Sequence, residues 1–143
     1  MEDDSVKLLR ECNAGIKMGI SSLDDVIDDV QNNGLRDVLI ESRDKHSRLG
    51  NETHDYLTKY HDDGKEPAPM AKAMAKVKSN FTTMGDNPDS SIASLITDGC
   101  NMGIKSLYRY LNQYPAADKD IKNLTNDIID TEDQLRQSLR PYL

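Results

Sequence analysis

Aromatic residues are scarce in this chain of 143 residues, which has no Trp, one Phe and six Tyr. The core must therefore come from Leu, Ile, Val, Met and Tyr on the narrow apolar stripes that amphipathic helices provide. Hydrophobic residues make up 36% of the chain and charged residues 30%. This balance favours an all-α fold over sheets, and the length fits a single domain over residues 1–143.

Long apolar runs and basic residues are also few. No run approaches the roughly 18 apolar residues of a membrane span, and the chain begins Met1-Glu2-Asp3-Asp4, where a secretory signal would be basic. We therefore expect a cytoplasmic protein with no membrane partner. Lys and Arg number 18 against 25 Asp and Glu, a formal charge of -7 that opposes phosphate neutralisation. We expect no nucleic-acid partner.

Only two cysteines occur, Cys12 and Cys100, which is too few for a disulfide framework. In a reducing compartment such thiols are usually buried and act as small hydrophobes. The chain also lacks a glycine-rich phosphate loop, a nucleophile elbow and a Cys-x-x-Cys pair. We therefore expect no catalytic residues, no cofactor and no enzymatic activity.

Apolar residues that recur at steps of three and four predict four long helices in two hairpins. The first hairpin spans residues 5–61, and its first helix runs to residue 31, before the Asn-Asn-Gly turn. The second spans residues 91–143, with Pro115 after its first helix. Residues predicted to face the core from the second and third helices are Leu35, Val38, Ser42, Lys45 or His46, Leu49, Thr53, Tyr56 and Tyr60, then Leu95, Gly99, Met102 or Gly103, Leu107 and Leu111.

The connection between the hairpins, residues 62–90, contains Gly64, Pro67 and Pro69 among charged residues and predicts a surface crossover. Within it a short amphipathic helix is predicted, whose apolar stripe fits a core position better than a binding surface. An adaptor that binds peptides at this helix would need the stripe to be exposed. The stripe consists of Met70, Met74, Val77, Phe81 and Met84.

An internal repeat links the two hairpins. Residues 12–17 read Cys-Asn-Ala-Gly-Ile-Lys and residues 100–105 read Cys-Asn-Met-Gly-Ile-Lys, which differ only at the third position. In the following helices an offset of 86 aligns Leu35 with Ile121 and Leu49 with Leu135. A duplicated helical hairpin explains this pattern, and each hairpin must cover the apolar stripe of the other.

Two hairpins joined by a long crossover form the arrangement of ferritin-like bundles. With its repeated Cys-Asn-x-Gly-Ile-Lys segments and its crossover helix, the chain resembles an uncharacterised bacterial ferritin-like family of four-helix bundles. The resemblance covers roughly residues 6–143 and implies an antiparallel bundle. Di-iron members of this fold carry a Glu-x-x-His motif on the second and fourth helices. Here Arg43 stands three residues before His46, and Ile129 three residues before Glu132, so both motifs are missing.

His46 and Glu132 are repeat-equivalent, since 132 minus 46 is 86, and should meet in the middle of the bundle. One interpretation is a hydrogen-bonded polar layer with Ser42 and Thr131 that fixes the register of the helices. The other is the remnant of a mononuclear metal site, for which His46 and Glu132 are the weak candidate ligands. Two ligands rarely suffice for tight binding, so we expect no metal.

These features favour a metal-free, non-enzymatic bundle that acts as a bacterial protein-interaction or stress-associated scaffold. The alternative is a metal-binding or oxidative-stress protein with an atypical site around His46 and Glu132. Tyr108, Tyr110 and Tyr114 cover more than one side of the third helix, so an exposed ring would fit a homodimer contact.

Overall fold

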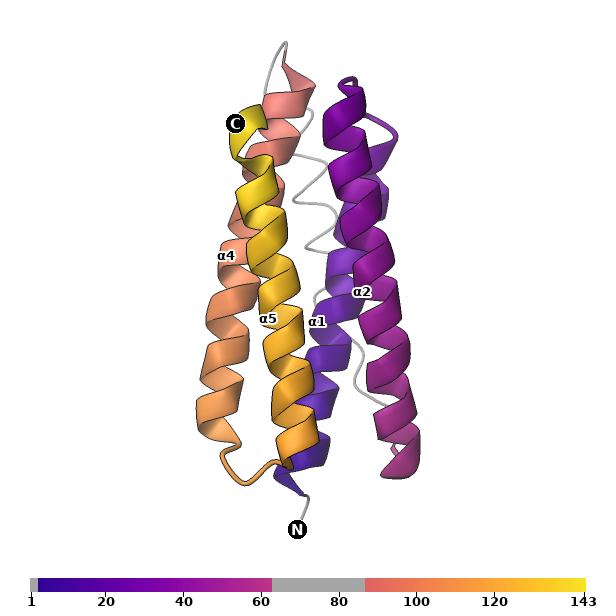
Figure 1. The fold of residues 1–143 in the computed structure, drawn as a ribbon, viewed down its shortest axis with the longest axis vertical. Coiled ribbons are helices and arrows are strands. Elements are labelled where there is room, and N and C mark those ends of the chain that lie inside the picture. Colours follow the sequence, from indigo (N-terminus) through magenta and orange to yellow (C-terminus); the bar gives the residue numbers. More distant parts are fainter. Residues whose placement is uncertain (1–2, 63–86) are drawn as a thin grey trace.

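Four long helices lie side by side in the computed structural model, which describes residues 3–62 and 87–143 (Figure 1). The predicted all-α class is confirmed, and the described residues contain no strand. The predicted crossover helix, from Met70 to Met84, lies outside the described residues. The elements are α1 (Asp4–Ile27), α2 (Asn33–Lys59), α4 (Pro88–Gln113) and α5 (Lys119–Leu139), followed by a short 3-10 helix, η1 (Arg140–Tyr142).

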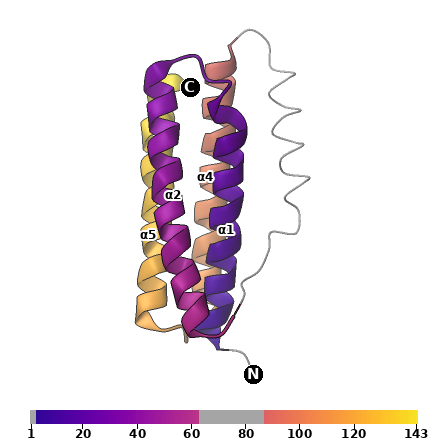
Figure 2. The ribbon, with the colours of Figure 1, turned by 90° about the vertical axis from the view of Figure 1, so that its right-hand side faces the viewer.

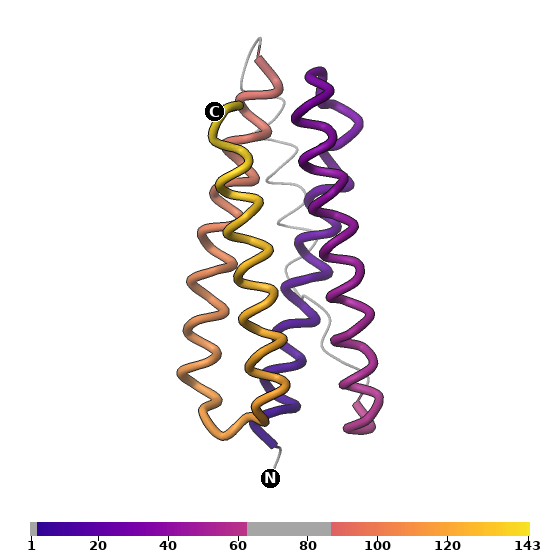
Figure 3. Tube along the Cα trace, in the orientation of Figure 1, coloured from indigo at the N-terminus to yellow at the C-terminus, as the bar shows by residue number. Residues whose placement is uncertain are grey.

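The two helices within each hairpin, α1 with α2 and α4 with α5, run in opposite directions, whereas α2 and α4 run in the same direction, as the trace in Figure 3 shows. Leu9 near the start of α1 shares a buried cluster with Leu57 near the end of α2. Val26 near the end of α1 shares a second cluster with Leu35 at the start of α2. The turned view in Figure 2 places α1 beside α4 on one side of the bundle and α2 beside α5 on the other. No described helix is long and apolar enough to cross a membrane.

The turn between α1 and α2 begins earlier than its sequence predicts. α1 ends at Ile27 rather than at residue 31, because the backbone N–H of Val30 bonds back to the carbonyl of Ile27 at 3.3 Å. The Asp89 carboxylate on α4 then accepts hydrogen bonds from the backbone N–H groups of Gln31, at 2.8 Å, and Asn32, at 2.9 Å. A side chain from the second hairpin therefore holds the turn of the first.

The core has two apolar clusters, one toward each end of the bundle. In α2 the predicted core residues Leu35, Ser42, His46 and Thr53 are buried. The prediction is wrong at Val38, which is only half-buried while its neighbour Leu39 is fully buried. In α4 the predicted core residue Leu107 is buried, but Leu95 lies at the edge of the core, which Ile92 and Ile96 fill instead. Buried side chains of α5 follow the sequence pattern and include Ile121, Leu124, Ile128, Leu135 and Leu139.

Candidate functional site: a groove beside a buried ion pair

A buried imidazole and a carboxylate meet between the two apolar clusters. His46 on α2 is 1% exposed, and its Nε2 lies 2.6 Å from Oε1 of Glu132 on α5. Its Nδ1 lies 2.7 Å from the backbone carbonyl oxygen of Ser42. Thr131 takes no part, because its hydroxyl donates to the carbonyl of Asp127. The polar layer expected from the repeat therefore consists of His46, Glu132 and Ser42.

The partners of His46 determine where its protons lie. The Ser42 carbonyl can only accept a hydrogen bond, so Nδ1 must carry a proton. The short contact between Nε2 and the Glu132 carboxylate needs a second proton between the two atoms. Burial alone would lower the pKa of His46, but the hydrogen bond that it donates to Glu132, the charge of Glu132 and the hydrogen bond to the Ser42 carbonyl raise the pKa above its usual value. The arrangement is that of an imidazolium bound to a carboxylate.

This raised pKa gives the stability of the protein a pH dependence. A group whose pKa is higher in the folded state stabilises the fold below its unfolded pKa, and this contribution is lost as the pH rises through the folded pKa. We expect the free energy of unfolding of the wild type, measured against that of His46→Gln, to fall as the pH rises from 5.5 through 9. Urea titrations across this range measure the difference. A difference that grows with pH would mean that His46 is neutral in the folded protein.

Both predicted buried thiols are confirmed, at 0% exposure for Cys12 and 2% for Cys100. The Cys12 thiol lies 3.3 Å from the hydroxyl of Thr125, and burial raises its pKa to about 11. Burial and the neighbouring Glu132 carboxylate also raise the pKa of Cys100. The two thiols belong to different core clusters and stay protonated, so neither is a nucleophile at neutral pH.

A groove between α1 and α4 opens over the ion pair. It has a volume of about 430 Å³, within the range of small-molecule sites. Its base includes His46 and Glu132, and its walls are mostly apolar or lack a side chain. The residues that line it from α1 and α4 are Glu11, Cys12, Ala14, Gly15, Met18, Gly19, Ser22 and Leu23, then Ile96, Gly99, Cys100, Met102, Gly103, Ser106, Leu107 and Tyr110.

Four glycines on the walls give the groove its width. A Cβ atom at Gly19 would lie 3.1 Å from the ring of His46, so the ion pair accounts for this glycine. At Gly103 a Cβ atom would lie 3.7 Å from Oε2 of Glu132. At Gly15 and Gly99 it would meet nothing within 4 Å. Glycine within a helix costs about 1 kcal/mol relative to Ala, and no contact of the described residues explains that cost at these two positions.

The internal repeat lines the groove from both sides. An offset of 88 relates Cys12 to Cys100 and Gly15 to Gly103, and the same offset relates the other lining residues of the two helices except Leu23 and Ile96. His46 and Glu132 at the base are themselves equivalent at an offset of 86. Equivalent positions of the two similar sequence segments therefore face each other across the groove.

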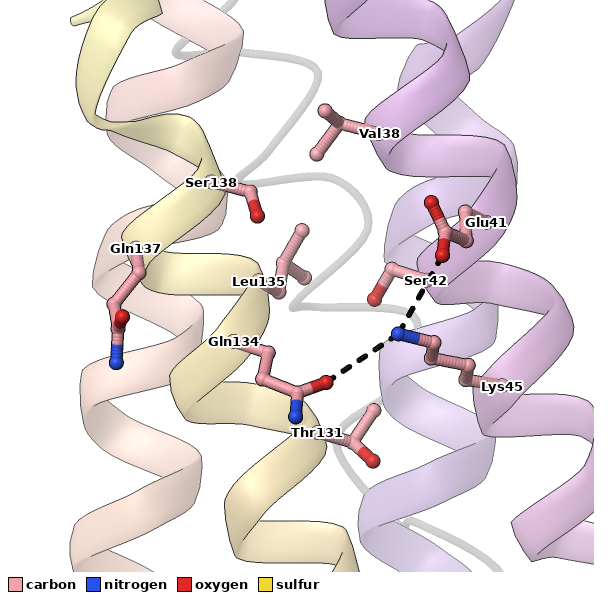
Figure 4. A pocket seen from close by; sticks show the side chains of 9 residues that line it. All are labelled: Val38, Glu41, Ser42, Lys45, Thr131, Gln134, Leu135, Gln137 and Ser138. Atoms are coloured by element: carbon pink, nitrogen blue, oxygen red, sulfur yellow. Dashed lines mark hydrogen bonds and ion pairs between the residues drawn. The ribbon is translucent and has the colours of Figure 1, made fainter.

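A second, more polar depression lies between α2 and α5 (Figure 4). It has a volume of about 270 Å³. Its cation, Lys45, already binds Oε1 of Gln134 at 3.3 Å and Oε1 of Glu41 at 3.6 Å (Figure 4). Val38, predicted to be a core residue, lines this depression together with Ser42 and Thr131. Because its charged groups already pair with one another, this depression is a weaker candidate than the α1–α4 groove.

Sequence reasoning brought His46 and Glu132 together but missed the groove. The available signal was the glycine in each copy of the repeat, Gly15 and Gly103, which the pattern placed on helices. The described residues contain no group of three or more His, Cys, Asp or Glu placed to hold a metal ion. Tyr108 is 52% exposed, so the expected homodimer contact through this ring stays a prediction. Comparison of the chain with protein-family models, curated proteins and solved structures finds no match.

Proposed function

We propose that this chain is a non-enzymatic binding protein whose α1–α4 groove takes a small, largely apolar molecule. Its architecture is that of a ferritin-like antiparallel bundle formed by two duplicated hairpins. The observation that carries the proposal is that both copies of the repeat line one groove of about 430 Å³. Mostly apolar pockets with a few convergent polar groups, one of them with a perturbed pKa, are the usual form of such sites.

The contacts of His46 oppose the alternative role in metal binding. Both ring nitrogens already have partners, Glu132 and the Ser42 carbonyl, so a metal would have to break a short hydrogen bond to reach either nitrogen. The imidazolium form has no free lone pair to offer a metal. We therefore propose that the pair is a structural element at the base of the groove and that the protein works without a metal.

A neutral dye tests the proposed function. We expect Nile red to bind the wild type with a blue-shifted emission, because the groove removes an apolar dye from water. Gly15→Leu and Gly99→Leu add side chains to open positions in the groove and should each weaken dye binding roughly tenfold or more, which corresponds to about 1.4 kcal/mol. Fluorescence titration measures the dissociation constant.

The control separates filling of the groove from a general change in the surface. Asn112→Leu adds the same side chain at an exposed position of α4 outside the groove and should leave the dye affinity unchanged. Both groove variants should fold, because they replace a helical glycine with a better helix former. Equal binding by the wild type and both groove variants, or no binding at all, would refute the proposed function.

A further inference from the structure

We infer that the groove selects amphipathic molecules that carry a protonated amine and rejects those that carry a carboxylate. This inference rests on the proposed function and adds the chemical class of the ligand. It begins with the charges along the groove. Among the described residues, those that line the groove include two carboxylates, Glu11 and Glu132, and no Lys or Arg. The one other charged group among these described lining residues is the imidazolium of His46, which is already bound to Glu132.

The Glu132 carboxylate reaches both walls of the groove. Its Oε1 lies 3.9 Å from the Cβ position of Gly19 on α1, and its Oε2 lies 3.7 Å from that of Gly103 on α4. Because these positions are glycines, no side chain from either one covers the carboxylate. The Glu132 side chain keeps 14% of its surface exposed. A ligand that enters between the helices therefore meets this carboxylate at the base.

The hydrogen-bonding capacity of Glu132 determines which ligand groups fit. A carboxylate accepts about four hydrogen bonds. Among the described side chains, only His46 and the Cys100 thiol interact with the Glu132 carboxylate in this way. The remaining lone pairs can accept a hydrogen bond from a ligand N–H or O–H group, but the ionised carboxylate has no proton to donate to a ligand carboxylate. An ammonium group gains a charge-assisted hydrogen bond here, whereas a ligand carboxylate would lose its water and face a like charge.

The rest of the groove suits the apolar body of such a ligand. Leu23, Ile96 and Leu107 contribute aliphatic side chains, and Met18 and Met102 contribute flexible thioethers that adapt to varied shapes. Met102 is 66% exposed, so the site can be reached from solvent. The chain carries a formal charge of -7, which raises the local concentration of cations and lowers that of anions. Size, polarity and charge therefore all favour an alkyl or aryl amine.

Displacement of Nile red by three ligands of equal chain length tests the inference. At pH 7, decylamine should bind the wild type roughly tenfold more tightly than decanol, because the ammonium donates to the carboxylate as a cation and the hydroxyl donates as a neutral group. Decanoate should bind most weakly, because its carboxylate has no proton to donate and carries a like charge. Glu132→Gln should remove the preference for the amine while the dye still binds. The Gln side chain can keep a hydrogen bond to a neutral His46, so this variant retains the shape of the base.

Asp130→Asn provides the matched control, because it removes one negative charge from an exposed position of α5 outside the groove. It should keep the order of the three ligands. Equal affinities for the three ligands, or an amine preference that survives in Glu132→Gln, would refute the inference and leave the proposed function intact if the dye binds. Failure of the dye itself to bind would refute the proposed function, and the inference with it.

Discussion

His46→Ala should lower the free energy of unfolding by about 3 kcal/mol. The substitution leaves the Glu132 carboxylate without its main partner in a largely buried position, and breaking one side of a buried pair typically costs 3–5 kcal/mol. It also leaves a cavity between the two core clusters, where His46 is 1% exposed. Urea unfolding followed by circular dichroism at pH 6 measures the change. His54→Ala removes an exposed histidine from the same helix and should change the stability by less than about 0.5 kcal/mol.

The double variant His46→Leu/Glu132→Met distinguishes the cost of an unpaired charge from the value of the pair. Well-packed apolar residues in place of a buried ion pair are often neutral or stabilising. We expect the double variant to recover to within about 1 kcal/mol of the wild type. A double variant as unstable as His46→Ala would show that the ion pair itself stabilises the fold. Its role would then go beyond fixing the register of the helices.

Leu39→Ala should destabilise the bundle by about 3 kcal/mol, whereas Val38→Ala should cost about 1 kcal/mol. Leu39 is fully buried, and its removal leaves a cavity that neighbouring helices fill only in part. Val38 is half-buried at the rim of the α2–α5 depression. Thermal and urea unfolding measure both values. The reverse order would show that α2 is rotated relative to the structure described above.

Leu143→Ala is the matched control for Leu39→Ala, because it makes the same change at a side chain that is 58% exposed. It should alter the free energy of unfolding by less than about 0.5 kcal/mol. A large effect at Leu143 would instead indicate that the end of the chain is buried in an assembly.

The sequence predicts the helices well and their rotation less well. Steps of three and four residues locate an amphipathic helix, but Val38 and Leu39 are adjacent and both apolar, so the pattern on α2 fits either residue. Packing of α2 against α1 and α5 decides between them, and this is tertiary information. On α5 the one adjacent apolar pair, Ile128 and Ile129, is buried at both positions, and there the predicted stripe is the buried one.

The candidate site also has one part that the sequence predicts, the His46–Glu132 pair, and one part that it does not, the groove. The internal repeat predicted that His46 meets Glu132, because this prediction needs only the offset of 86 between the two sequence segments. The groove could not be predicted, because it results from missing side chains on two helices that the sequence does not place side by side. Gly15 and Gly103 lie on the walls of the α1–α4 groove and were visible in the sequence. A glycine in a helix nevertheless has several explanations until its neighbours in space are known.

The meeting of His46 and Glu132 at equivalent positions restricts how this bundle can be assembled. If two identical copies of the first hairpin paired in the same way, two imidazoles would face each other, and two copies of the second hairpin would bring two carboxylates together. Either pairing places like groups in a buried contact, where at most one of them can carry its charge. A base opposite an acid therefore requires two unlike halves, and joining both in one polypeptide guarantees one of each in every molecule.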